Sequence, residues 1–220
     1  MSVKVIYFVR HGETELNAKG IRQGPDGPLS EFGRRQVAET AKKFPPKKGK
    51  PKIIISSPFQ RAKETAAILA EHLKLKVEYS DLLRERKNPT QIVGHSGKED
   101  VVRYIVDTID KTFHADDLRY SDEENFTDLR NRARDLLKFL QRRRERQIIA
   151  VTHGIFLKMV VAYMLYGEKL TASDYNKLSF FNPMDNAALT ICTCTKKLFR
   201  KPKWELLVWN NTPIPDPVKD

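Results

Sequence analysis

Cysteine is scarce in this chain, and the scarcity excludes two classes of protein. Among 220 residues there are two cysteines, Cys192 and Cys194. Two cysteines cannot build a multi-disulfide framework or a four-cysteine zinc site. Residues two positions apart point to the same face of a strand, which is poor geometry for a disulfide. We therefore expect both thiols in the core of a protein of a reducing compartment, the cytoplasm.

Long apolar runs are also missing. No stretch approaches the ~20 apolar residues that a membrane-spanning helix needs, so we expect no membrane association. The N-terminus enters a β-like run at once, without the basic and apolar regions of a secretory signal peptide, so we expect no such signal. The sequence lacks a Gly-x-x-x-x-Gly-Lys-Ser/Thr loop, which argues against a P-loop nucleotidase.

Negative charge is in short supply. The chain has 40 Lys and Arg against 28 Asp and Glu, a formal net charge of +12. Much of the excess falls in three clusters, 42–52, 142–146 and 196–203, which we interpret as two solvated loops and one helix C-terminus. Such an excess can steer anionic substrates toward the protein. No nucleic-acid-binding motif accompanies it, so we do not expect nucleic acid as a partner.

Short apolar runs alternate with amphipathic segments along the chain. Runs rich in β-branched residues predict strands, and apolar residues three or four apart predict helices. The expected strands cover 3–9, 53–55, 75–79, 146–152, 189–193 and 204–209, and the expected helices begin near 30, 59, 101, 127 and 155. This alternation is typical of a single three-layer α/β/α domain with a mostly parallel central sheet and helices on both faces. We place the domain at residues 1–212 and expect a loosely ordered tail at 213–220.

Arg10, His11 and Gly12 stand where the first strand should end. In open α/β sheets, ligands bind at the carboxyl ends of the strands. Arg10 offers a planar donor fork suited to phosphate, and His11 offers a nitrogen nucleophile that is partly neutral near pH 7. Gly12 would let a bulky anion approach the backbone. Taken alone, the triplet is explained equally well as a turn with a chance Arg-His pair.

Two further strands lead to residues of the same kinds. Arg61 follows the second strand, and His153 and Gly154 follow the fourth. Parallel strands share one carboxyl edge, so two arginines and two histidines should converge in one crevice, where a helix opening at Gly154 adds its positive end. His11, His153 and Glu85 could form a metal-ligand set. The two arginines would repel a divalent cation, so we expect no metal and no other cofactor.

Four separated motifs support this convergence. They read VRHGETELN at 9–17, GPLSEFGRRQ at 27–36, SSPFQRAKETA at 56–66 and VTHG at 151–154. In residue types and spacing they resemble the motifs of the histidine phosphatase superfamily, the phosphoglycerate-mutase-like fold. The resemblance extends over most of residues 1–166 and implies a phosphatase.

The resemblance implies a role for each of five residues. His11 would be the nucleophile that forms a covalent phosphohistidine. Arg10, Arg61 and His153 would bind the phosphoryl group, and Asn17 would line its pocket. These roles agree with elementary chemistry, because a phosphoryl group in flight spreads negative charge over its oxygens and arginines offer paired charge-assisted hydrogen bonds.

The resemblance also implies a carboxylate acid/base on the loop after the third strand. Glu85 is the matching position, and Asp81 is the alternative acid. Glu85 is flanked by Arg84, Arg86 and Lys87. An acid/base role therefore requires that the three cations face outward while Glu85 faces the crevice.

The region after Glu85 departs from the mutases of the family, in which an aromatic-glycine segment and a longer insert follow this glutamate. The departure favours a phosphomonoester hydrolase over mutase-type phosphoryl transfer; a non-catalytic binder of phosphorylated ligands or nucleic acid is the other alternative. Residues 86–126 should form a lid over a small phosphorylated substrate or a phosphoprotein. His95, Lys98 and Arg103 could reach that substrate, although solvated loop positions explain them better.

Overall fold

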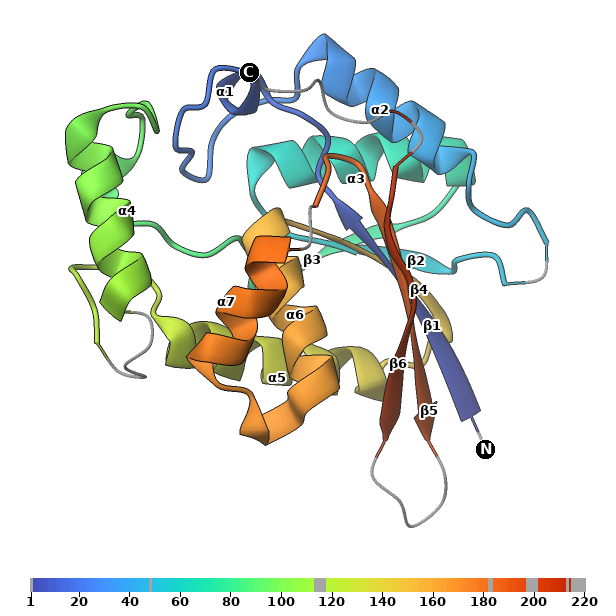
Figure 1. The fold of residues 1–220 in the computed structure, drawn as a ribbon. Helices are drawn as coiled ribbons and strands as arrows, with labels where there is room; N and C mark the ends of the chain where they lie inside the picture. Colours follow the sequence, from blue (N-terminus) through green and yellow to red (C-terminus); the bar gives the residue numbers. More distant parts are fainter. Residues whose placement is uncertain are drawn as a thin grey trace.

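A central sheet separates two layers of helices in the computed structural model of the chain (Figure 1). The structure describes residues 2–47, 49–112, 118–181, 184–196, 202–212 and 214. The six strands lie in the order β3-β2-β4-β1-β5-β6. Their bounds are β1 Ser2–Arg10, β2 Ile53–Ser56, β3 Val77–Tyr79, β4 Gln147–Thr152, β5 Leu189–Lys196 and β6 Lys203–Asn211.

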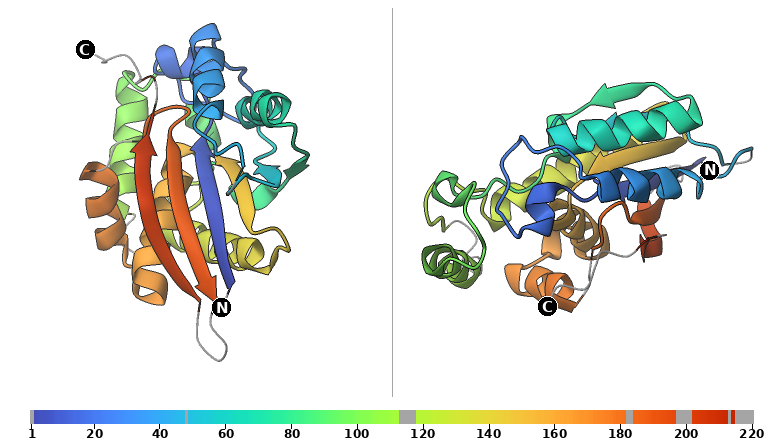
Figure 2. Two further views of the ribbon diagram at one scale, coloured as in Figure 1. Left: turned by 90° about the vertical axis from the view of Figure 1, so that its right-hand side faces the viewer. Right: turned by 90° about the horizontal axis from the view of Figure 1, so that it is seen from above.

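Helices cover both faces of this sheet (Figure 2). They are α1 Glu15–Ala18, α2 Glu31–Ala41, α3 Gln60–Leu73, α4 Asp100–Thr112, α5 Phe126–Arg142, α6 Gly154–Tyr166 and α7 Ala172–Phe181. Side chains of β1 alternate between the layers: Tyr7 and Val9 pack with α2 and α3, whereas Ile6 and Phe8 pack with α5 and α6. The expected three-layer α/β/α domain is confirmed.

The direction of the strands decides where their ends meet. β1, β2, β3 and β4 are mutually parallel. On the other side of β1, β5 runs antiparallel to β1, and β6 runs antiparallel to β5. The register pairs Arg10 with Thr152 and Ser56 with Val151. The last residues of three parallel strands therefore lie side by side at one edge, as the mostly parallel sheet predicted.

Two helices were not expected from the sequence. The short helix α1 overlaps the start of the polar, Gly- and Pro-rich stretch 17–28, which reads as a loop. Its N-cap is Thr14, whose side chain accepts a hydrogen bond from Asn17 N. One turn is too short to show a helical period. The helix α7 is the second, and its apolar residues form no single stripe from which a helix could be predicted. The expected tail at 213–220 lies outside the described residues except for residue 214.

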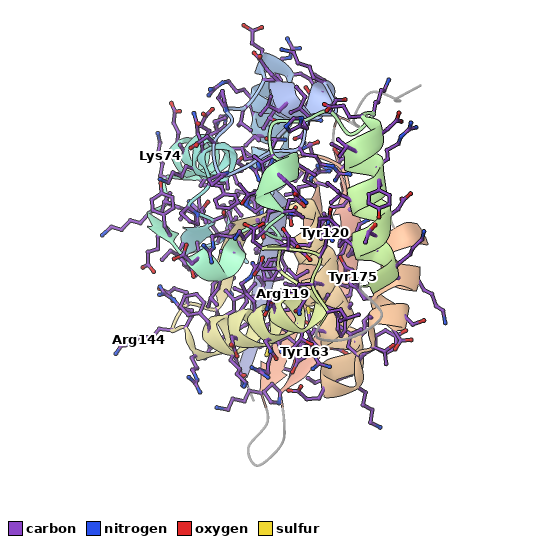
Figure 3. All side chains as sticks on the ribbon, turned by 90° about the vertical axis from the view of Figure 1, so that its left-hand side faces the viewer. Lys74, Arg119, Tyr120, Arg144, Tyr163 and Tyr175 are labelled. Atoms are coloured by element: carbon purple, nitrogen blue, oxygen red, sulfur yellow. The ribbon has the colours of Figure 1, made fainter. Side chains whose placement is uncertain are left out.

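The charged clusters and the cysteines can be placed on this fold. Both thiols are free and buried in β5, as expected. Of the cluster at the end of α5, Arg144 is exposed and points away from the fold (Figure 3), while Arg143 pairs with Glu78 and Glu145. Part of the cluster at 196–203 lies outside the described residues. Across the described ranges, no helix is both long and apolar enough to cross a bilayer.

The segment between Glu85 and α5 forms a small unit of its own. It contains α4, whose buried residues pack with Ile92 in a cluster separate from the two main ones. In Figure 1, α4 lies to the side of the three layers. The segment that precedes α4 is hydrogen-bonded to the loop after α1. Arg22 N donates to His95 O at 2.9 Å, and Gly97 N donates to Gly20 O at 2.9 Å. The lid assigned to residues 86–126 stays a prediction.

The loop after β1 lies so close to α2 that only glycine fits between them. A Cβ atom on Gly33 would lie 2.0 Å from the carbonyl oxygen of Glu13, and one on Gly12 would lie 2.6 Å from the carbonyl oxygen of Gly33. Ser30 Oγ also donates to the Glu13 carboxylate over 2.8 Å. The expectation that Gly12 makes room for an anion is therefore wrong, because the space beside it belongs to the backbone of α2.

This contact predicts whether replacing Gly33 raises or lowers the free energy of unfolding. Alanine is favoured over glycine inside a helix by about 1 kcal/mol, yet Gly33→Ala should lower the free energy of unfolding by roughly 1–3 kcal/mol, because its methyl group overlaps a backbone carbonyl. Urea denaturation measures the change. Arg35→Ala, at an exposed position of the same helix, is the control and should change the value by less than about 0.5 kcal/mol. A Gly33→Ala protein as stable as the parent would contradict the close approach.

Candidate active site

All of the predicted site residues except His153 line one cavity at the carboxyl edge of the sheet, and His153 is fully buried next to His11. Arg10 ends β1, His11 follows it, Arg61 lies in the first turn of α3, and His153 precedes α6. The cavity measures about 370 Å³. Its lining includes Arg10, His11, Asn17, Arg22, Gln23, Arg61, Glu85, Asn88, Gly154, Lys158 and Met184.

His11 is buried and is held in one orientation. Its Nδ1 lies 2.7 Å from the carbonyl oxygen of Gly12, and its Nε2 lies 3.3 Å from Arg61 Nε. A carbonyl can only accept and a guanidinium can only donate, so these partners assign the proton to Nδ1. The lone pair is therefore on Nε2, beside an arginine that lines the cavity.

His153 lies next to His11, with ring centroids 5.1 Å apart. Its Nε2 is 2.8 Å from Ser57 Oγ, and its Nδ1 is buried with no hydrogen-bond partner in the described part of the chain. The ring of Phe59 packs against His153 at a centroid distance of 5.2 Å. The second histidine is thus fixed by a hydroxyl and an aromatic ring.

Burial and positive neighbours favour the neutral form of both histidines. The pKa of His11 is lowered well below its ordinary value by burial first and then by Arg61 and Arg10. The pKa of His153 is lowered by burial, and then by Arg61, His11 and Arg10. The same surroundings therefore disfavour a positive charge on His153.

The two arginines are held by backbone carbonyls. Arg61 Nη1 donates to Gly24 O over 2.8 Å, and Arg10 Nη1 donates to Met184 O. Burial lowers the pKa of Arg61 to about 10, although Glu85 acts in the opposite direction. A Cβ on Gly154 would lie 3.3 Å from Arg10 Nε, so the glycine gives this side chain room.

Glu85 reaches the cavity, and its carboxylate is held by backbone amides. Its Oε1 accepts from Phe156 N at 2.9 Å and from Arg86 N at 2.8 Å, and its Oε2 accepts from Ile155 N at 3.2 Å. Two backbone amides at the start of α6 therefore donate to Glu85. The sequence did not reveal this contact.

An acid/base role for Glu85 requires that its three cationic neighbours face outward, and two of the three do so. Arg84 and Lys87 are exposed, as required, whereas Arg86 is half-buried. The alternative acid, Asp81, is 75% exposed and pairs with Arg84 Nε at 3.5 Å. It is not among the residues that line the cavity, so the geometry favours Glu85.

Sequence reasoning missed two cations of the cavity, Lys158 and Arg22. Lys158 is one turn beyond Gly154 in α6, and a single lysine in an otherwise apolar helix could have drawn attention to it. Its pKa is lowered by burial and then by Arg10, while Glu85 raises it. The pKa of Arg22 is lowered by burial and then by Arg86.

Three candidates lie elsewhere. His95 pairs with Glu99 at 3.1 Å, Arg103 pairs with Asp100, and Lys98 is exposed. None of the three lines the cavity, which agrees with solvated positions. Within the described residues there is no group of three or more His, Cys, Asp or Glu that could hold a metal ion.

Two arginines and two buried histidines thus gather at the carboxyl edge of a mostly parallel sheet in an α/β protein. The family model of the histidine phosphatase superfamily (branch 1) matches residues 6–212. The chain belongs to this superfamily.

Relatives and solved structures agree with that membership. Over 163 residues, 72% of this chain and 67% of the other, the chain is 30% identical to a metal-independent phosphoserine phosphatase of Arabidopsis thaliana. Over 82 residues, 37% of this chain, it is 42% identical to an uncharacterized phosphatase, PhoE, of Bacillus subtilis. The structure of a mycobacterial glucosyl-3-phosphoglycerate phosphatase with VO3 has a TM-score of 0.76 and 26% identity, covering 94% of this chain and 99% of that one. The matches span 36–42% of the length of three curated relatives.

The lowered pKa values of the two buried histidines predict how stability depends on pH. An unfolded histidine titrates near ~6.5, and the native His11 and His153 titrate lower. From about pH 6.5 down to those lowered values, the unfolded chain binds protons that the native protein does not. The free energy of unfolding should therefore fall with acidity, by at most about 1.4 kcal/mol per pH unit for each histidine.

Urea denaturation between pH 7.5 and 5.5 measures this slope. His153→Gln should make the slope smaller by the contribution of that one histidine. The control is His72→Gln, at an exposed position on α3, which should leave the slope as it is. A slope that His153→Gln does not alter would show that the pKa of His153 is not lowered in the native protein.

Proposed function

We propose that the chain is a phosphomonoester hydrolase that works through a covalent phosphohistidine on His11. The observation that carries the proposal is the orientation of this ring. Gly12 O holds the Nδ1 proton, and Nε2 lies beside Arg61 in the cavity. A neutral imidazole with its lone pair next to a cationic donor is an activated nucleophile for a phosphoryl group.

The surrounding cations would hold the phosphoryl oxygens. Arg10 and Arg61 supply charge-assisted donors, and His153 supplies a ring nitrogen beside His11. Asn17 and Gly154 line the same cavity and would contact the bound phosphate. The charge that a metal would otherwise supply comes from the arginines, so the reaction needs no metal and no other cofactor.

Glu85 would act as the general acid and then as the general base. In the first step His11 Nε2 bonds to phosphorus, the ester P–O bond breaks, and Glu85 donates a proton to the leaving oxygen. In the second step the oxygen of a water molecule bonds to phosphorus as Glu85 takes its proton, and the P–N bond to His11 breaks. Inorganic phosphate leaves, and His11 returns to its neutral form.

Small phosphorylated molecules are the substrates that the site and the relatives favour. The relatives named above are a phosphoserine phosphatase and a glucosyl-3-phosphoglycerate phosphatase. Arg22 and Lys158 line the cavity in addition to the phosphate-binding arginines, so a substrate with a second anionic group would be complemented there. A cytoplasmic location is part of the proposal, supported by the free thiols of Cys192 and Cys194.

Trapping tests the proposed intermediate. A short reaction with a radiolabelled phosphomonoester, quenched by denaturation, should leave a label on the protein that is lost in acid and survives alkali. His11→Ala should carry no label, and His72→Ala should carry as much as the parent. A strong chelator should not reduce the labelling. A label that survives acid, or that His11→Ala retains, would overturn the assignment.

The leaving group tests the role of Glu85. Glu85→Gln keeps the shape of the side chain and removes proton transfer, so turnover of alkyl phosphates should fall by roughly 10²–10⁴-fold. Aryl phosphates need less protonation and should be slowed much less. Asp81→Asn is the control and should affect neither class. Equal effects of Glu85→Gln on both classes, or a leaving-group effect of Asp81→Asn, would remove Glu85 from the role.

A further inference from the structure

The loop that carries Glu85 is fastened along its backbone. Its carbonyl oxygens accept hydrogen bonds from residues that belong to other parts of the chain. These bonds are Thr152 Oγ1 to Leu83 O at 2.9 Å, Arg132 Nη1 to Arg84 O at 2.6 Å, Arg132 Nη2 to Glu85 O at 3.3 Å, and Glu124 N to Lys87 O at 3.1 Å. A loop bonded in this way cannot rotate Glu85 out of the cavity without breaking several of them.

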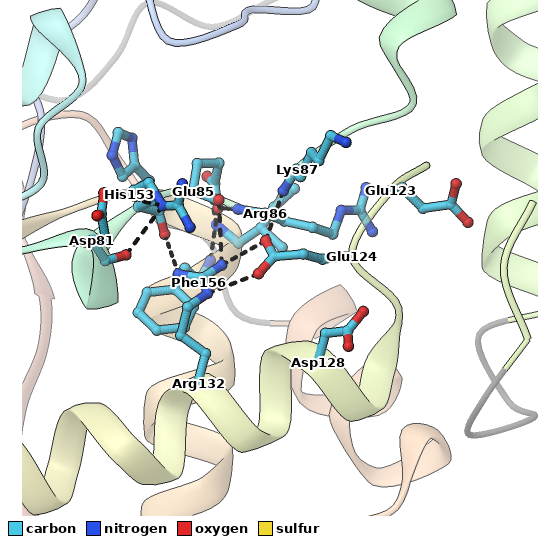
Figure 4. Close-up of polar contacts among 12 residues, drawn as sticks. Asp81, Glu85, Arg86, Lys87, Glu123, Glu124, Asp128, Arg132, His153 and Phe156 are labelled. Atoms are coloured by element: carbon cyan, nitrogen blue, oxygen red, sulfur yellow. Dashed lines mark hydrogen bonds and ion pairs between the residues drawn. The ribbon is translucent and has the colours of Figure 1, made fainter. Parts of the chain in front are cut away.

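Arg132 of α5 makes two of these bonds and is largely buried, with a side chain that is 9% exposed (Figure 4). Its Nε and Nη2 bond both oxygens of Glu124, at 2.9 and 2.7 Å. Its guanidinium lies over the ring of Phe156, 3.9 Å from the centroid. Phe156 is the residue whose amide holds the Glu85 carboxylate. One guanidinium thus touches the backbone of Glu85 and also the residue that orients its side chain.

We propose that Arg132 is a positioning residue for Glu85, and that Glu124 is its charge partner in this task. The inference rests on the proposed acid/base role of Glu85. The positive charge of Arg132 is taken up by Glu124, so the Glu85 carboxylate is held by neutral amides and stays directed at the cavity. Arg132 donates to the carbonyls on the N-terminal and C-terminal sides of the Glu85 α-carbon, which fixes the direction of the side chain.

Only the shape of arginine fits this arrangement. The planar fork presents its N–H groups in fixed directions, two toward Glu124 and others toward two successive carbonyls, while its flat face stacks on an aromatic ring. Lysine could pair with Glu124 as a point charge, but it could not bridge both carbonyls and cover the ring of Phe156. An Arg132→Lys protein therefore keeps the charge and loses part of the positioning.

Kinetics on two ester classes test the proposal. Arg132→Met should lower kcat/KM for an alkyl phosphate by roughly 10²-fold, the scale of a misplaced catalytic group, and should lower that of an aryl phosphate much less. Arg132→Lys should show the same preference with a smaller loss. Inhibition by inorganic phosphate should stay unchanged, because Arg10 and Arg61 are untouched. The control is Arg134→Met in the same helix, whose arginine pairs with Asp135, and it should affect neither ester.

A double variant separates positioning from general stability. If Arg132 acts through Glu85, adding Arg132→Met to Glu85→Gln should produce no further leaving-group effect. Effects that multiply, or an equal loss on both esters, would overturn the proposal, and Arg132→Lys provides the same comparison if Arg132→Met does not fold. If Glu85→Gln itself shows no leaving-group effect, the proposed function fails. If Glu85→Gln shows the effect and the Arg132 variants do not, only the positioning role fails.

Discussion

The pairing of β4 with β1 on one side and β2 on the other is the constraint on which the site depends. All three strands are parallel, and the register sets Arg10 opposite Thr152 and Ser56 opposite Val151. A one-residue slip would turn every side chain of a strand to the other face. Because β1 packs into both helical layers, with Ile6 and Phe8 on one face and Tyr7 and Val9 on the other, such a slip is costly. The strand ends are therefore held side by side by the core itself.

The crevice at these ends concentrates positive charge before any ligand arrives. Arg61 is almost fully buried and lies beside His11, and desolvation is the first cause of the lowered pKa of both groups. Burying cations without a full set of counter-ions costs free energy. The cost is reduced by the carbonyl of Gly24 and by the ring of Phe59, which lies 5.2 Å from the Arg61 guanidinium carbon. A dianionic phosphoryl group would relieve what remains, which is the arrangement expected of a preorganised oxyanion site.

The position of the acid/base candidate depends on different contacts from those that place the other residues of the site. Arg10, His11 and His153 project from strand ends whose position the sheet determines. Glu85 instead lies on an irregular loop, and its direction depends on α5, α6 and the segment that leads into α5 (Figure 4). An irregular loop lacks the regular backbone hydrogen bonds of a helix or sheet, so its carbonyl groups need donors from other parts of the chain. The sheet thus positions one part of the site, and two helices of one layer position Glu85.

Much of this protein follows from local patterns in its sequence. The strands, most helices, and the convergence of Arg10, Arg61 and His153 follow from periods of two and 3.6 residues and from the rule that parallel strands share an edge. The four motifs together identified the family, and the one at residues 9–17 contains the nucleophile candidate. These features could be predicted because each is encoded by residues that are near one another in the chain.

The tertiary structure alone decided what surrounds those residues. Gly12 makes room for α2 and not for a ligand, Lys158 enters the cavity from α6, and Arg132 reaches a loop 47 positions earlier in the chain. The lowered pKa of His153 was also beyond the sequence, since burial is its first cause. Each of these depends on distances between elements that the core packing sets. No local period encodes such distances, so residue types and spacing could not reveal them.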